Sequence, residues 1–121
     1  MDIVMLNKIL TMKKLKEIKL MIQIAQQGWS EIEGEIQRDH SPSLSTKKEL
    51  LKNLLEDIRK NIEHLLFNFK CSMLVKVCRK FLENTFLISE KLGSSYGFAG
   101  YNESYYILDT IKIAEGFSKK S

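Results

Sequence analysis

An arginine and a histidine five positions apart are the side chains best suited to chemistry in this sequence. They are Arg59 and His64, in the run Arg-Lys-Asn-Ile-Glu-His. A histidine changes its charge near neutral pH, so it can accept and return a proton. A guanidinium can hold two phosphate oxygens at once. Together the two side chains could cleave a phosphodiester bond without a metal ion.

This spacing resembles the Arg-x4-His motif of HEPN-type ribonucleases, which are helical bundles that cut RNA, usually as dimers. The resemblance would make His64 the acid/base group and Arg59 the phosphate clamp of a metal-independent endoribonuclease. The family often has a small polar residue directly after the arginine, where this chain has Lys60. On an ideal helix, two positions five residues apart point about 140° away from each other.

Ion pairs between successive helical turns are the competing interpretation of the same run. Glu56 and Lys60 are spaced i,i+4, and so are Arg59 and Glu63. Opposite charges at this spacing are neighbours on a helix surface. We therefore predict no catalytic residue, and we keep the ribonuclease as the alternative function.

The remaining reactive side chains predict no metal site and no cofactor. Cys71 and Cys78 would lie about 10 Å apart on one helix, which is too far for a disulfide. No further ligand stands near them at a zinc-type spacing, so we expect reduced, buried thiols. His40 is expected in an exposed turn. The glycine-rich segment 93–101 follows no strand, so it does not predict a phosphate-binding loop.

Aromatic residues are concentrated between residues 96 and 106. Tyrosine and phenylalanine are favoured anchors in protein interfaces, especially beside glycines that let a loop adapt. One alternative is that these rings fold back and close one end of the fold, and another is that they line a ligand cavity. We predict a partner-binding surface that consists of Tyr96, Phe98, Tyr101, Tyr105 and Tyr106.

Most of the chain carries apolar residues at helical spacing. The first helix is expected to end before Pro42, because proline disfavours helical geometry at the preceding residue. Its seven-residue repeat would place one apolar seam along one side. The seam consists of Leu15, Ile18, Ile22, Ala25, Trp29, Ile32 and Ile36.

A second helix is predicted to start at a capping box formed by Thr46 and Glu49. Its apolar seam consists of Leu51, Leu55, Ile58, Ile62, Leu65 and Phe69, widened by Leu54 and Leu66. The apolar phase then slips, so we predict a break in helicity within residues 67–73. A single kinked helix is the alternative. The stripe of the third helix consists of Leu74, Val77, Phe81, Ile88 and Leu92.

Gly93 is predicted to end the third helix, because glycine readily adopts the left-handed conformation after a last turn. Residues 93–101 would then form a loop, and Asn102 would cap a last helix. The narrow apolar face of that helix consists of Ile107, Ile111, Ala114 and Phe117. The predicted fold class is all-α: an antiparallel bundle of about four amphipathic helices in one domain, residues 1–121. Residues 1–11 and 118–121 are the ends expected to fray.

Charge and hydropathy narrow the functional classes. The net charge is +4, and the positive charge is concentrated in residues 8–19. Nucleic-acid binding through these lysines is a third functional hypothesis, although nucleic-acid binders usually carry a denser basic stripe. The lysines interrupt every apolar run near the amino terminus, so no signal peptide and no membrane span are predicted. The expected location is the cytoplasm.

The sequence therefore predicts a small module that works by contact with another protein. Immunity proteins, antitoxins, inhibitors and adaptors belong to this class. The general build resembles that of small bacteriocin-immunity proteins, which are basic four-helix bundles, and this resemblance is one of shape only. A homodimer through the seam of the first helix is a further option, because such seams also join chains.

Overall fold

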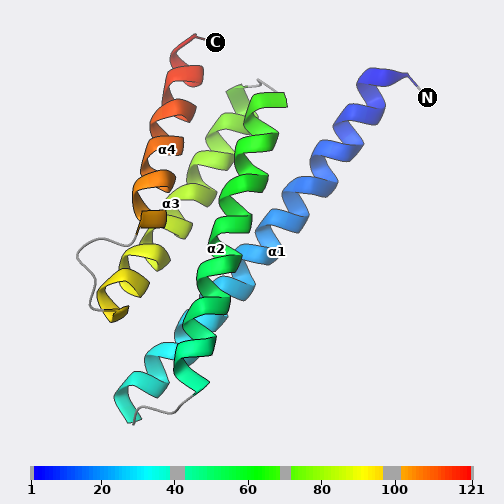
Figure 1. Cartoon of the computed structure of the whole chain (residues 1–121). Helices are drawn as coiled ribbons and strands as arrows, with labels where there is room; N and C mark the ends of the chain where they lie inside the picture. The colour runs from blue at the N-terminus through cyan, green and yellow to red at the C-terminus, as the bar shows by residue number, and fades with distance from the viewer. Residues whose placement is uncertain (1, 39–42, 69–71, 97–101, 121) are drawn as a thin grey trace.

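The chain is almost entirely helical in a computed structural model, which describes residues 2–38, 43–68, 72–96 and 102–120. Within these residues it forms four helices and no strand. The helices are α1 (Ile3–Arg38), α2 (Ser43–Asn68), α3 (Ser72–Tyr96) and α4 (Asn102–Lys120). Figure 1 shows them as a bundle in which successive helices run in alternating directions. The prediction of an all-α helical bundle is confirmed.

The direction in which α2 packs against α1 follows from two contacts between the C-terminal part of α1 and the N-terminal part of α2. Leu51 Cδ1 lies 3.8 Å from the position that a Cβ would occupy on Gly28. Farther along α1, Glu35 forms an ion pair with Lys47 at the start of α2. Residue numbers therefore rise along one helix as they fall along the other, which is the arrangement of an α-helical hairpin.

The predicted seams of α1 and α2 form most of the core. The α2 side chains Leu51, Leu55, Ile58, Ile62, Leu65 and Leu66 are buried, as are Ile18, Ile22, Ala25 and Ile32 of α1. Trp29 packs against this core, and its indole Nε1 donates a hydrogen bond to Glu33 Oε2 at 2.9 Å. The α1 seam is therefore only partly buried in its own chain, since Leu15 and Trp29 are half-buried and Ile36 is 37% exposed.

The apolar face of α3 differs from the predicted stripe. Leu74, Ile88 and Leu92 of that stripe are buried, whereas Val77 and Phe81 are only partly buried. The core also receives a series of side chains spaced 3, 4, 3, 4 and 3 residues apart: Val75, Cys78, Leu82, Thr85, Ser89 and Leu92. This helical period is not apparent in the sequence, because two positions of the series, Thr85 and Ser89, carry hydroxyl rather than apolar side chains. The Thr85 hydroxyl is satisfied within the helix, since Oγ1 donates to the Phe81 carbonyl oxygen at 2.8 Å.

Two predicted helix boundaries are wrong. The second helix begins at Ser43, so Thr46 lies exposed inside the helix and cannot cap it. The earlier start brings Leu44 into the core. The third helix continues through Gly93, which is buried, to Tyr96. Glycine costs a helix about 1 kcal/mol relative to alanine. Burial of the adjacent Leu92 and the packing of α3 against α4 can offset that cost.

Other boundaries agree with the sequence. The first helix ends at Arg38, before Pro42, and the last begins at Asn102. The predicted break in helicity is confirmed, because α2, which ends at Asn68, and α3, which begins at Ser72, run in opposite directions (Figure 1). The helical ranges include most of the ends that were expected to fray, since α1 starts at Ile3 and α4 reaches Lys120; the expectation of fraying stays a prediction.

The two central helices organise the bundle. Each of α2 and α3 packs against every other helix, whereas α1 and α4 make no contact with each other in the described part of the chain. Figure 1 accordingly shows α1 and α4 on opposite sides of the α2–α3 hairpin, with the N-terminal turns of α1 diverging from the bundle. Across the described ranges, no helix combines the length and apolar character needed to cross a bilayer.

We predict that Ile58→Asp abolishes cooperative thermal unfolding monitored by circular dichroism. The Ile58 side chain is fully buried, and the substitution would bury a carboxylate with no partner. The matched control on the same helix is Leu50→Asp, because Leu50 is 63% exposed. That control should unfold like the unchanged protein. Equal melting curves for both variants would contradict the assignment of this core.

Cys78 gives a prediction about pH. Burial raises the pKa of the Cys78 thiol from 9.0 to about 11. The unfolded chain ionises this thiol at lower pH than the folded chain, so its contribution to stability is complete below about pH 9 and lost as the pH approaches 11. In a Cys71→Ser background, the fall in unfolding free energy from pH 8 to pH 11 should be smaller after Cys78→Ala.

The same burial should protect the thiol from reagents. At pH 8 iodoacetamide should alkylate Cys78 of the folded protein much more slowly than in urea, because the thiolate is the reactive form. Equally fast alkylation in both conditions would show that the thiol is accessible.

Candidate functional site

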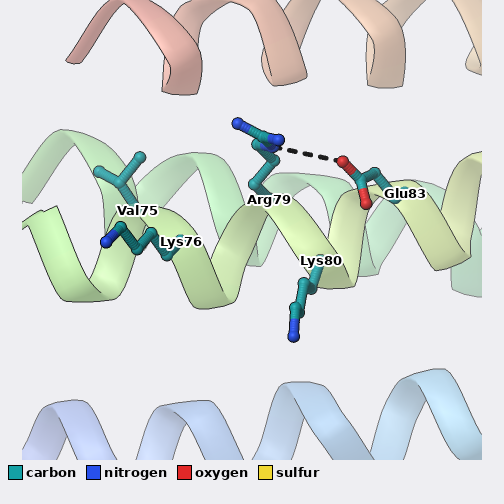
Figure 2. A pocket seen from close by; sticks show the side chains of 5 residues that line it. All are labelled: Val75, Lys76, Arg79, Lys80 and Glu83. Carbon is teal, nitrogen blue, oxygen red and sulfur yellow. Dashed lines mark hydrogen bonds and ion pairs between the residues drawn. The ribbon is translucent and has the colours of Figure 1, made fainter. Parts of the chain in front are cut away.

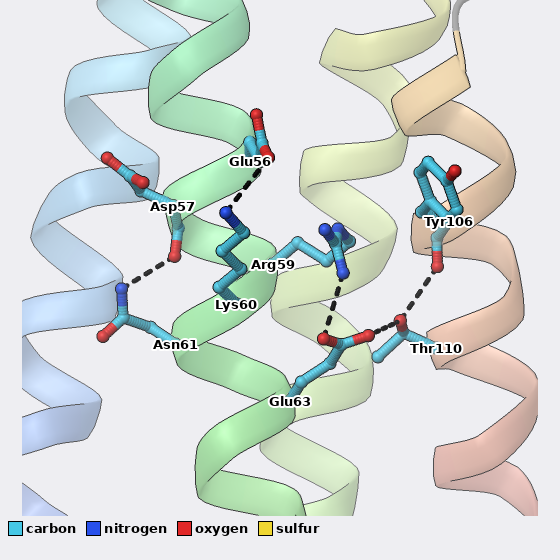
Figure 3. Close-up of polar contacts among 8 residues, drawn as sticks. All are labelled: Glu56, Asp57, Arg59, Lys60, Asn61, Glu63, Tyr106 and Thr110. Atoms are coloured by element: carbon cyan, nitrogen blue, oxygen red, sulfur yellow. Dashed lines mark hydrogen bonds and ion pairs between the residues drawn. The ribbon is translucent and has the colours of Figure 1, made fainter.

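Arg59 is held in the contact between α2 and α4. Its guanidinium Nη1 lies 3.0 Å from Glu63 Oε2, and its side chain is 13% exposed. The central carbon of the guanidinium lies 5.3 Å from the centroid of the Tyr106 ring on α4. A cation at this distance from an aromatic ring is attracted to its electron-rich face. Figure 3 shows these side chains reaching across between the two helices.

Glu63 extends the same cluster to Thr110. The Thr110 hydroxyl lies 2.9 Å from Glu63 Oε1 and 2.8 Å from the carbonyl oxygen of Tyr106, so its one hydrogen faces two acceptors (Figure 3). Glu63 thus contacts Arg59 on its own helix and Thr110 on α4. Since Arg59 and Glu63 meet Tyr106 and Thr110 in ascending order, α2 and α4 run parallel and are fixed in register.

His64 lies in different surroundings from Arg59. It is exposed on α2, where its Nε2 lies 3.0 Å from the side-chain nitrogen of Asn68. Arg59 is directed toward α4 instead. The two ion pairs predicted for this helix are both present, since Lys60 Nζ lies 3.1 Å from Glu56 Oε1 and Arg59 pairs with Glu63. The contacts of the Arg-x4-His pair are therefore those of a structural helix face.

Two of the five predicted partner-binding residues are described, and both are exposed. Tyr105 is 60% and Tyr106 is 56% exposed, near the start of α4. Both stand on a helix rather than on a loop. The backbone of Tyr96 belongs to the last turn of α3, but its side chain lies outside the described part. Phe98 and Tyr101 lie wholly outside it.

The exposed tyrosines are part of a longer apolar surface on α4. Leu108 and Ile113 are also exposed, at i+3 from Tyr105 and i+7 from Tyr106. Sequence reasoning named the tyrosines but missed these two residues. The signal was available in the spacing, because positions i, i+3 and i+7 share one side of a helix. We call the side chains of Tyr105, Tyr106, Leu108 and Ile113 the α4 surface.

A second feature is a basic groove of about 310 Å³ on α3. Figure 2 shows Arg79 pointing toward α4 and Lys80 pointing toward α1. Arg79 Nε pairs with Glu83 at 3.3 Å, which offsets part of the positive charge. Lys76 and Val75 complete the lining. The groove could attract an anion, but its cations stand on one exposed helix face without a buried polar group to fix a ligand.

Metal chemistry has no support in the described ranges, where no three His, Cys, Asp or Glu side chains form a group suited to a metal ion. The chain matches no protein family model, and its comparison with curated proteins and with solved structures gives no significant match. Function must therefore be inferred from the geometry and charge of the chain itself.

We predict that Arg59 is structural and that His64 is dispensable. Arg59→Ala should lower the unfolding free energy by about 1–2 kcal/mol, because it removes a cation–π contact and a charged hydrogen bond. His64→Ala should change it by less than about 0.5 kcal/mol. Neither substitution should change the fate of single-stranded RNA incubated with the protein. Cleavage by the unchanged protein that disappears in His64→Ala would establish the ribonuclease instead.

Proposed function

We propose that this protein is a non-catalytic interaction module of the immunity, antitoxin, inhibitor or adaptor type, acting in the cytoplasm by binding another protein. The observation that carries the proposal is the exposure of two adjacent tyrosines on a helix whose opposite face is packed in the core. Ile107, Thr110 and Ile111 anchor α4 in the core, while Tyr105 and Tyr106 stay in solvent.

Tyrosine suits this role because its ring supplies a large contact area while its hydroxyl tolerates water. It loses little conformational freedom on binding, since only two side-chain angles must be fixed. Tyr106 is further restricted by the guanidinium of Arg59. A side chain that is already held in place before binding costs less entropy when a partner covers it.

The surroundings of the tyrosines have the composition of an interface. Leu108 and Ile113 extend the apolar contact, and Asp109 and Lys112 stand exposed between them. Charged groups among apolar contacts determine mainly which partner binds and in which orientation. Tyr96, Phe98 and Tyr101 precede α4 directly in the chain and remain in the proposed surface, which therefore extends along residues 96–113.

The double change Tyr105→Ala and Tyr106→Ala should leave the protein folded and remove partner binding. Because both rings are more than half exposed, the loss of unfolding free energy should stay near the value of the Arg59 contact, about 1 kcal/mol. A photo-reactive phenylalanine analogue at Tyr105 should crosslink one defined protein in cells of the native host. The matched control is the same analogue at Leu87, an exposed residue of α3.

Specificity is tested by adding Tyr106→Ala to the Tyr105 crosslinking variant. Interface hot spots contribute several kcal/mol each, so this change should reduce the crosslink at least about tenfold. Equal crosslinking from Leu87, or a crosslink that survives Tyr106→Ala unchanged, would contradict the proposal.

A further inference from the structure

The N-terminal turns of α1 present an apolar surface that no helix of the bundle covers. Residues 2–10 are all exposed, and Ile18 is the first buried residue of α1. Figure 1 shows this part of the helix diverging from the other three. The exposed apolar side chains are Ile3, Val4, Met5, Leu6, Ile9, Leu10 and Met12. An exposed apolar surface of this extent on a helix that already has a core face needs a physical reason.

These side chains are not evenly distributed around the helix. At about 100° per residue, all except Val4 fall within one half of the circumference. Asn7, Lys8, Thr11 and Lys14 occupy the other half, with Val4 among them. The segment is therefore amphipathic in its own right. Its apolar half faces away from the continuation of the buried seam through Ile18.

Charge identifies the kind of surface that fits this helix. Residues 8–19 contain five lysines and a single acidic residue, Glu17. Lys13 and Lys16 follow Met12 on the same side of the helix, so their long stems can reach along apolar groups while the ammonium groups stay in a polar layer. A helix with an apolar half bordered by lysines matches an interface that is apolar inside and anionic outside.

We propose that residues 3–19 of α1 bind the surface of an anionic lipid bilayer. The apolar half of residues 3–12 lies among the upper acyl chains, and the lysines of residues 8–19 contact lipid phosphates. The bundle stays in water on the same side, because the buried seam starts only at Ile18. The segment projects from the bundle, so this binding requires no unfolding of the core.

A second copy of the chain is a weaker candidate for the same surface. Lys13 and Lys16 lie on the same side of α1 as the apolar half. A second copy paired along this side would bring these lysines close to those of the other copy, where like charges repel. The apolar half of residues 3–12 is also wider than the narrow seam that a two-helix pairing covers.

Vesicle sedimentation tests the proposal with the whole chain. The protein should sediment with vesicles of equal parts phosphatidylglycerol and phosphatidylcholine, and much less with phosphatidylcholine alone. Raising the salt should weaken the binding, because salt screens the attraction of lysines to anionic lipid. Equal binding to both kinds of vesicle, or to neither, would overturn the proposal.

Substitutions locate the surface. The double change Leu6→Asp and Leu10→Asp should reduce binding to the anionic vesicles at least about tenfold, since it places two charges in the apolar half. The melting temperature should not change, because both side chains are exposed. The matched control is Leu50→Asp with Leu87→Asp, two exposed leucines of α2 and α3, and it should bind like the unchanged protein. Equal binding by the Leu6/Leu10 variant would refute the assignment.

Light scattering separates the membrane from a second copy. The protein without vesicles should have the monomer mass of 14.1 kDa. A dimer that dissociates on Leu10→Asp would assign the surface to a second copy and overturn the proposal. The membrane inference is independent of the proposed function, because the α4 surface and residues 3–19 lie on helices whose described residues make no contact with each other. Loss of one activity would leave the other unchanged.

Discussion

The structure depends on the need to cover the α2–α3 hairpin from two sides. Both central helices carry apolar residues that no two-helix pair could bury, since a helix hairpin shields only the surfaces that face each other. α1 covers one side and α4 covers the other, and those two outer helices do not touch in the described residues. The core side chains of α2, including Leu55, Ile58 and Ile62, are completely buried as a result.

Apolar burial determines only approximately how each helix is rotated about its axis, and polar contacts fix that rotation more closely. Thr85 and Thr110 are buried hydroxyl residues, and each donates to the carbonyl four residues earlier in its helix, so neither carries an unsatisfied donor. Across the α2–α4 contact, Glu63 and Arg59 meet Thr110 and Tyr106. This contact sets how far α4 is rotated. The rotation leaves Tyr105 and the α4 surface turned outward, where a partner can reach them.

The two proposed activities use opposite edges of the bundle and different physical forces. Binding at the α4 surface depends on tyrosine rings held by the fold. Binding by residues 3–19 depends on apolar side chains and lysines on a helix that extends past the core. With this arrangement the protein could bind a lipid surface through residues 3–19 while α4 remains exposed to solvent. The lysines would then add to the attraction between a basic chain and the anionic inner face of a membrane.

The sequence by itself determined the all-α class, the buried parts of the seams of α1 and α2, the break after Asn68 and the two ion pairs around Arg59, because these features depend on spacings within one helix. Only the tertiary structure decided the rest. It placed Thr85 and Ser89 in the α3 seam, continued α3 through Gly93, and set Arg59 against a ring 47 positions away. It also left residues 2–10 uncovered, because α1 is longer than the core that it covers. Each of these outcomes depends on which neighbouring helix supplies the contact, and spacing along a single helix does not contain that information.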